Sequence, residues 1–216
     1  FSEPLQRVKQ ALKATRNAKP FQVVLRHAPF THTWEITGTE VCGNNWCGAA
    51  VMCFPSQSRI RMAISSLAVQ DMAGNPLDGN ANGKYEGSSL DDYTFEVAFD
   101  DTVRRTAPRV IRTIPSDEER EVPRDTPIEV WFDRAMAKSS FTSDTVIFPA
   151  GSLHTSFKAF DTSDTVATTV AARDTALRAT KLVILHDTLE PLRSYYPQVL
   201  YGVTDLFQNC LKMTQL

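Results

Sequence analysis

The stretch Asp78–Lys84 has the side chains and the spacing of a calcium-binding loop. Oxygen-bearing side chains stand at its first, third and fifth positions, a glycine at the sixth and a backbone carbonyl at the seventh, as in the first half of such loops. Ser89 takes the place of the expected bidentate Glu, so a later carboxylate must close the site. The predicted ligands are Asp78, Asn80, Asn82, Lys84 through its carbonyl, and Asp91 or Asp92.

A single charged ligand in the first half of this loop predicts weak binding, with a Kd on the order of 10⁻⁴–10⁻³ M. Calcium is the only cofactor that the sequence suggests. The alternative is a polar hairpin loop without a metal, because Asp-Gly and Asn-Gly are common turn dipeptides.

Three of the four cysteines lie close together, at Cys42, Cys47 and Cys53, and Cys210 stands alone. A disulfide between two of the first three is expected, which favours an oxidising compartment. Free buried thiols and a metal site are the alternatives, although the usual zinc spacings are missing. The spacing leaves the pairing open, and Cys210 is expected to be a small buried apolar residue.

Aromatic residues provide a second candidate binding site. Trp46 lies in a Gly/Asn loop between two cysteines, so it is a candidate ligand contact, for example with a glycan. The alternative is that its ring folds over a disulfide of its own loop. Trp131 lies in an apolar strand and is predicted to be in the core.

The chain shows no catalytic constellation. It has no Gly-x-Ser-x-Gly nucleophile turn and no glycine-rich phosphate loop. Its paired carboxylates are adjacent residues, which point to opposite faces of a strand. We therefore predict no catalytic residues and a protein that is not an enzyme.

Composition excludes several classes of protein. The 216 residues are 42% hydrophobic and 22% charged, which is typical of a globular rather than a disordered chain. A net charge of −2 creates no strong field for nucleic acid or for anionic membranes. The longest apolar runs, such as Leu182–Leu185, are far shorter than the roughly 20 residues of a transmembrane helix.

Two internal matches suggest one structural unit used twice. Asp71–Leu77 and Asp205–Leu211 share Asp, Asn and Leu at an offset of 205 − 71 = 134. Phe1–Leu5 matches Phe132–Met136 at an offset of 132 − 1 = 131. The predicted organisation is a first domain over 1–100 that lacks its first strands, a linker over 101–107, and a second domain over 108–216 that lacks its last strand. The chain is thus expected to be a window on a longer protein.

The elements that must position these residues are mostly short strands. An amphipathic helix is predicted over Pro4–Arg16, from apolar residues at helical spacing. The predicted strands are Gln22–Leu25, Thr33–Ile36, Ala49–Phe54, Arg59–Ala63, Tyr93–Phe99, Arg109–Ile114, Pro127–Phe132, Thr145–Phe148, Thr165–Ala171, Lys181–Leu185 and Tyr196–Val203. The predicted core includes Phe95, Phe99, Ile128, Val130, Phe132, Val183 and Leu185. This pattern favours an all-β protein with two β-sandwiches and one short N-terminal helix.

These segments resemble the bacterial Ig-like domain of S-layer and other surface proteins. The matching segments are Val69–Leu77, Tyr93–Phe95, Ala107–Val110, Thr113–Ser116, Pro127–Asp133, Leu182–Leu185, Tyr195–Tyr196 and Val203–Asp205. Residues 6–58 fit the pattern poorly. The resemblance implies a tandem of immunoglobulin-like β-sandwiches in a secreted or cell-surface protein.

The function expected from this resemblance is a non-catalytic structural or adhesive segment, with neighbouring domains or subunits as partners. One alternative is an accessory module, glycan-binding or spacer, of an extracellular carbohydrate-active enzyme. Another is a subunit of an extracellular filament or layer, completed by strand addition from a neighbour. Binding of nucleic acid and insertion into a membrane are not expected.

Overall fold

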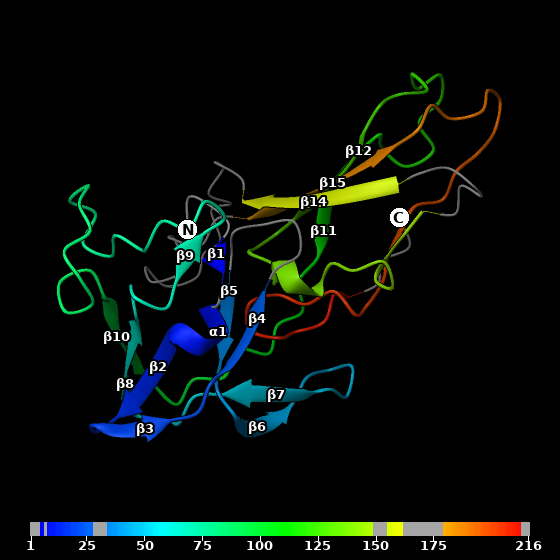
Figure 1. Ribbon diagram of the computed structural model, residues 1–216. Coiled ribbons are helices and arrows are strands. Elements are labelled where there is room, and N and C mark those ends of the chain that lie inside the picture. Colours follow the sequence, from blue (N-terminus) through cyan, green and yellow to red (C-terminus); the bar gives the residue numbers. More distant parts are fainter. Residues whose placement is uncertain (1–4, 7, 28–33, 149–154, 162–178, 213–216) are drawn as a thin grey trace. The chain divides into compact units, whose positions relative to one another are not determined.

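The structure is a computed structural model that describes residues 5–6, 8–27, 34–148, 155–161 and 179–212 (Figure 1). Its strands form several antiparallel sheets, and the described residues contain one short α-helix and one 3₁₀ turn. The predicted all-β fold with one short helix is therefore confirmed. The predicted strand Thr165–Ala171 and the segment Phe1–Pro4 lie outside the described residues.

The chain divides into two compact units. Of the described residues, unit 1 contains those up to His27, those from 34 to 43, and Met52–Val103; unit 2 contains Asn44–Val51 and the residues from Arg104 onward. The division passes through a hairpin formed by β6 (Glu40–Asn44) and β7 (Ala50–Cys53). The tip of this hairpin is therefore part of unit 2, although it comes early in the sequence.

Unit 1 is built around one four-stranded sheet in the order β10–β8–β2–β3, whose first three strands lie side by side in Figure 1. Two smaller pairs, β1–β9 and β4–β5, complete the unit. Its elements are β1 (Leu5–Gln6), α1 (Val8–Ala11), β2 (Leu12–Arg16), β3 (Lys19–Phe21), β4 (Val24–His27), β5 (Trp34–Thr37), β8 (Ser58–Ile64), β9 (Gln70–Asp71) and β10 (Tyr93–Phe99). The strand predicted over Tyr93–Phe99 is confirmed at both ends.

Unit 2 contains a four-stranded sheet in the order β11–β12–β15–β14 and a separate pair, β13–β16. Its elements are β11 (Val110–Ile114), β12 (Ile128–Phe132), η1 (Lys138–Ser140), β13 (Val146–Ile147), β14 (Thr155–Asp161), β15 (Thr180–His186) and β16 (Gln198–Val199). Val146 and Val199 from the pair lie in the same buried cluster as Val130 and Leu182 from the larger sheet. The two sheets of unit 2 thus share one core, as in a β-sandwich.

Each unit has its own hydrophobic core. In unit 2, the predicted core residues Ile128, Val130 and Phe132 are buried on β12. In unit 1, Phe95 and Phe99 pack against a cluster that contains Ile60 and Met62. Burial of these apolar surfaces stabilises each sheet by about 25 cal/mol per Å² removed from water.

The face of β15 was predicted wrongly. Leu182 and Ile184 are buried, whereas Val183 is half-buried and Leu185 is 41% exposed. Every residue from 182 to 185 is apolar, so the sequence has no alternation that could identify the inner face.

Two further predictions are corrected. The predicted helix over Pro4–Arg16 is helical only at Val8–Ala11, and Leu12–Arg16 is strand β2 because it pairs with the central strand β8. Trp131 is half-buried on the outer face of β12 rather than in the core. The cationic groups of Arg112 and Lys181 lie 5.7 and 5.1 Å from its ring centroid, so the cations cover the ring in place of core residues.

Candidate functional site

The segment Asp71–Leu77 of unit 1 forms a tight turn closed by its own Asp and Asn. Asp71 N donates to Asn75 O at 3.0 Å, and Asn75 N donates to Asp71 Oδ1 at 2.8 Å. Leu77 N then donates to Val69 O at 3.2 Å, which returns the chain beside the strand it left. Residue 71 also pairs with residue 5 across β1–β9.

The segment Asp205–Leu211 of unit 2 forms the same turn. Asp205 N donates to Asn209 O at 2.9 Å, and Asn209 N donates to Asp205 Oδ1 at 2.9 Å. Leu211 N donates to Val203 O at 2.8 Å. Met136 forms an isolated bridge with Asp205, which corresponds to the pairing of residues 5 and 71. The Asp, Asn and Leu that the two segments share thus form the same set of hydrogen bonds in both.

The two turns differ in their contact with water. The hydrogen bond from the Asn75 side chain, at 2.7 Å, lowers the pKa of Asp71, with backbone bonds from the same turn adding to the effect. Asp205 is fully buried, and burial raises its pKa against the hydrogen bonds from Asn209 and Phe207 and the charge of Arg134. The surroundings therefore favour the charged form of Asp71 and disfavour the charged form of Asp205, its counterpart in the second turn.

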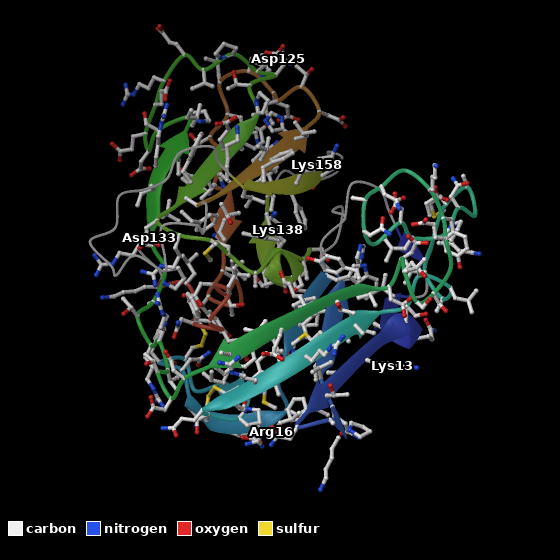
Figure 2. The ribbon with its side chains drawn as sticks, turned by 90° about the vertical axis from the view of Figure 1, so that its left-hand side faces the viewer. Lys13, Arg16, Asp125, Asp133, Lys138 and Lys158 are labelled. Carbon is white, nitrogen blue, oxygen red and sulfur yellow. A yellow bond between two sulfur atoms is a disulfide. The ribbon has the colours of Figure 1, made fainter. Side chains whose placement is uncertain are left out.

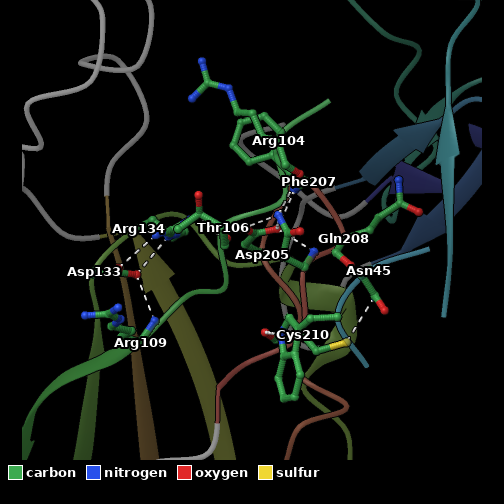
Figure 3. Close-up of polar contacts among 12 residues, drawn as sticks. Asn45, Arg104, Thr106, Arg109, Asp133, Arg134, Asp205, Phe207, Gln208 and Cys210 are labelled. Atoms are coloured by element: carbon green, nitrogen blue, oxygen red, sulfur yellow. Dashed lines mark hydrogen bonds and ion pairs between the residues drawn. The ribbon is translucent and has the colours of Figure 1, made fainter. Parts of the chain in front are cut away.

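Arg134 connects the unit 2 turn to the start of that unit (Figure 3). Its Nη1 lies 3.5 Å from Asp205 Oδ2 and donates to Thr106 O at 2.9 Å. Its Nε and Nη2 each donate to Asp133 at 3.0 Å, and Asp133 accepts a further bond from Arg109 N. Burial disfavours the charged guanidinium, but Asp133 and Asp205 outweigh burial and raise its pKa. This network fixes the turn and brings no nucleophile or proton donor to an open site.

The tip of the β6–β7 hairpin is attached to the same turn by a disulfide between Cys47 and Cys210. Asn45 Nδ2 donates to Gln208 O at 2.8 Å (Figure 3). Trp46 Nε1 donates to Cys210 O at 2.8 Å. The Trp46 side chain is nevertheless 52% exposed. The sequence did not predict this pairing, because Cys210 is 163 residues from its partner and no spacing pattern indicates it.

Cys42 and Cys53, two of the three clustered cysteines, form the second disulfide. They are 11 residues apart and join the two strands at the base of the same hairpin. Both ends of the hairpin are thus cross-linked, the base within unit 1 and the tip within unit 2.

The predicted calcium ligands lie in the exposed loop that follows the unit 1 turn. Asp78 and Asn80 begin it, and its last residues are the buried Asp91 and the half-buried Asp92. Asp92 Oδ1 accepts hydrogen bonds from Ser66 N and Ser66 Oγ at 2.8 and 3.1 Å. Calcium binding stays a prediction, and the loop is treated further below.

A shallow hollow of about 390 Å³ lies beside His186. Its lining residues are Thr155, Ser156, Leu185, His186 and Asp187. Both ring nitrogens of His186 lie within hydrogen-bonding distance of backbone carbonyls, Asp187 O at 2.8 Å and Thr126 O at 2.9 Å. The ring also stacks on Phe148, so this histidine has a structural explanation. In the described part of the chain, no three His, Cys, Asp or Glu side chains are grouped so that they could hold a metal.

The fold and these contacts define a β-sheet module in which the polar network around Asp205 stabilises a turn of the module itself. Residues 104–215, more than half of the chain, match the family described as Bacterial Ig-like domain, and the chain belongs to this family. Domains of the family are typical of bacterial surface proteins and are generally non-catalytic. No curated protein and no solved structure matches the chain. None of the helices within the described ranges is long and apolar enough to cross a membrane.

Proposed function

We propose that this chain is a non-catalytic structural or adhesive segment of a secreted or cell-surface bacterial protein of the S-layer type. The observation that carries the proposal is the family match over residues 104–215, which contains the whole core of unit 2. The best-defined polar network in that unit, around Arg134 and Asp205, consists of bonds within the unit. It stabilises a turn and needs no substrate to explain it.

We extend the proposal to a tandem arrangement in which unit 1 is a second, divergent copy. Its support is the turn at Asp71–Leu77, which repeats the hydrogen bonds of Asp205–Leu211 and the strand pairing of its Asp. Val69 and Val203, the residues that accept the closing bonds, are both fully buried. A shared turn with a shared buried anchor favours duplication over an accidental match.

Two disulfides support an extracellular location. Disulfides persist in oxidising compartments and are rare where thiols are kept reduced. Cys42–Cys53 and Cys47–Cys210 together use all four cysteines of the sequence.

Labelling of intact cells tests the proposal. Lys13 on β2 and Lys158 on β14, both labelled in Figure 2, have exposed side chains, one in each unit. In the bacterium that makes the protein, a membrane-impermeant amine reagent should modify both lysines before lysis, or the protein should be found in the medium. Peptides that are labelled only after lysis would contradict the proposed location.

Trp46 favours a second candidate function, glycan binding. The disulfide of Cys47 and the bond from Trp46 Nε1 to Cys210 O hold the indole, while half of its surface stays exposed. A fixed, exposed aromatic ring is suited to stack on a sugar, because its ordering cost is met before binding. A glycan array with the wild type and the Trp46→Ala variant tests this, and equal signals from both proteins would exclude Trp46 as the contact.

A further inference from the structure

The loop between Asp78 and Asp91 folds around carboxylate and amide oxygens. Asp78 Oδ1 accepts a hydrogen bond from Asn82 N at 3.2 Å, and its Oδ2 accepts one from Gly83 N at 2.7 Å. Gly83 has a φ of +82°, a conformation in which glycine carries no steric penalty. The first half of the loop is therefore wrapped around the Asp78 carboxylate.

The second half of the loop contains a buried carboxylate oxygen that has no hydrogen-bond partner. Asp91 is fully buried, and its Oδ2 accepts bonds from Glu86 N and from Gly87 N. Its Oδ1 has no partner. A buried, unpaired carboxylate oxygen is costly, and a cation beside it would remove that cost. Because Oδ2 is bonded to the backbone at residues 86 and 87, the carboxylate lies within the loop.

Several contacts bring the two halves of the loop together. Asn80 Nδ2 donates to Glu86 Oε2 at 3.4 Å and to Leu90 O at 3.3 Å, and Asn82 Nδ2 donates to Glu86 Oε2 at 2.5 Å. A Cβ built on Gly79 would lie 2.0 Å from the backbone oxygen of Asp91. The residue after Asp78 therefore touches the backbone of Asp91, and only glycine permits this approach.

The amide oxygens of the first half can still accept a cation. Asn80 Oδ1 accepts one bond, from Asn82 N at 3.0 Å, and Asn82 Oδ1 accepts one bond, from Lys84 N at 2.8 Å. Each such oxygen has a second lone pair. The oxygen groups that the loop offers are those of Asp78, Asn80, Asn82, the Lys84 carbonyl and Asp91, with two carboxylates among them.

We propose that this loop binds Ca²⁺ and that Asp91, rather than Asp92, supplies the closing carboxylate. Hard cations of this size take six to eight oxygens from carboxylates, amides and carbonyls. Thiolate and imidazole ligands, which select transition metals, do not take part in the loop. Asp91 is preferred to Asp92 because Asp91 has the buried oxygen without a partner, whereas Asp92 Oδ1 already accepts two hydrogen bonds from Ser66.

Terbium luminescence gives a direct test, because Tyr85 lies inside the loop and can transfer excitation to a bound lanthanide. The disulfide-bonded wild-type protein should sensitise Tb³⁺. Ca²⁺ should displace it with a Kd on the order of 10⁻⁴–10⁻³ M, and Mg²⁺ should displace it far less well. Titration calorimetry with CaCl₂ gives the same constant without terbium.

Two matched variants separate Asp91 from Asp92. The Asp91→Asn and Asp78→Asn variants should each weaken Ca²⁺ by about tenfold or more, while Asp92→Asn should leave its Kd within about twofold. Wild type should melt a few degrees higher in calcium than in EDTA, and Asp91→Asn should lose that shift. The EDTA melts also show whether each variant is folded.

The inference is overturned if wild type gives neither calorimetric heat nor terbium displacement at about 10 mM Ca²⁺, well above the expected Kd. Equal Ca²⁺ affinity in wild type and Asp91→Asn would also overturn it, as would a loss confined to Asp92→Asn.

Discussion

The turns at Asp71–Leu77 and Asp205–Leu211 have the same backbone hydrogen bonds and opposite electrostatics. The first is solvated, contains Gly74 and Pro76, and has a carboxylate whose pKa is lowered. The second is buried, has Gln208 and Cys210 at the matching positions, and has a carboxylate whose pKa is raised. The comparison indicates that the Asp and Asn specify the turn by themselves. The surroundings then decide whether it is stabilised by local geometry or by a partner side chain and a disulfide.

Removal of the disulfide at the second turn should have the largest effect. The Cys47→Ser/Cys210→Ser variant should lose about 4 kcal/mol of unfolding free energy, because the cross-link restricts a long segment of the unfolded chain. The matched Cys42→Ser/Cys53→Ser variant removes a cross-link between residues only 11 apart and should lose about 2.5 kcal/mol. Urea denaturation of both variants measures the difference.

Amide hydrogen exchange shows where the disulfide acts. In the Cys47→Ser/Cys210→Ser variant, protection should fall at Asn209 N and stay unchanged at Asn75 N. Equal losses at the two turns would show that the disulfide does not act specifically on the second turn.

Replacement of the two aspartates should have unequal effects. Asp205→Asn should cost about 2 kcal/mol, because an amide NH2 would replace the Oδ2 that accepts from Asn209 Nδ2 and faces Arg134 Nη1. Asp71→Asn should cost much less, because water can replace its bonds. Urea denaturation at neutral pH tests the ranking, and equal losses would remove the proposed role of burial.

The pH dependence of these two variants should have opposite signs. Because the pKa of Asp205 is raised, the folded protein keeps this proton where the unfolded chain has lost it, so its stabilising contribution falls as the pH rises above about 4. The pKa of Asp71 is lowered, so its contribution is present above about pH 4 and is lost as the pH falls. Urea denaturation from acidic to neutral pH measures the difference in unfolding free energy between wild type and each variant. For Asp205→Asn this difference should become smaller as the pH rises, and for Asp71→Asn it should become smaller as the pH falls.

Substitution of the residue with positive φ in each turn, Gly74 or Gln208, should have the smallest effect. Gly74 has a φ of +89°, with open space around a built Cβ, and Gln208 has a φ of +64°. Gly74→Ala should destabilise by about 1 kcal/mol, and Gln208→Gly should stabilise by about 0.5 kcal/mol, because only glycine adopts this conformation without strain. Thermal melts of both variants test this, and shifts of the same sign would show that the two positions are not equivalent.

Where a local pattern decides the structure, the sequence was sufficient. The alternation in Tyr93–Phe99 predicted β10 to the residue, and the shared Asp, Asn and Leu marked two segments that form the same turn. Leu12–Arg16 has helical spacing but forms a strand, because pairing with β8 outweighs its local preference.

The candidate site depended more on long-range contacts. The sequence placed the oxygen-rich loop at Asp78, but it could not distinguish Asp91 from Asp92, because the unpartnered oxygen of Asp91 and the bonds from Ser66 to Asp92 depend on the folded structure. It could not pair Cys47 with Cys210 either, since a disulfide depends on proximity in space.

The Cys47–Cys210 bond also has a mechanical consequence. Tension applied before Cys47 and after Cys210 passes through the two sulfur atoms instead of the stretch of chain between them, which spans a sequence separation of 163 residues. Fully extended, that stretch would lengthen the chain by roughly 540–590 Å. The disulfide prevents this extension even when the β-sheets of unit 2 are pulled apart. While the disulfide is intact, this stretch cannot extend under load, and reduction of the one bond makes its length available.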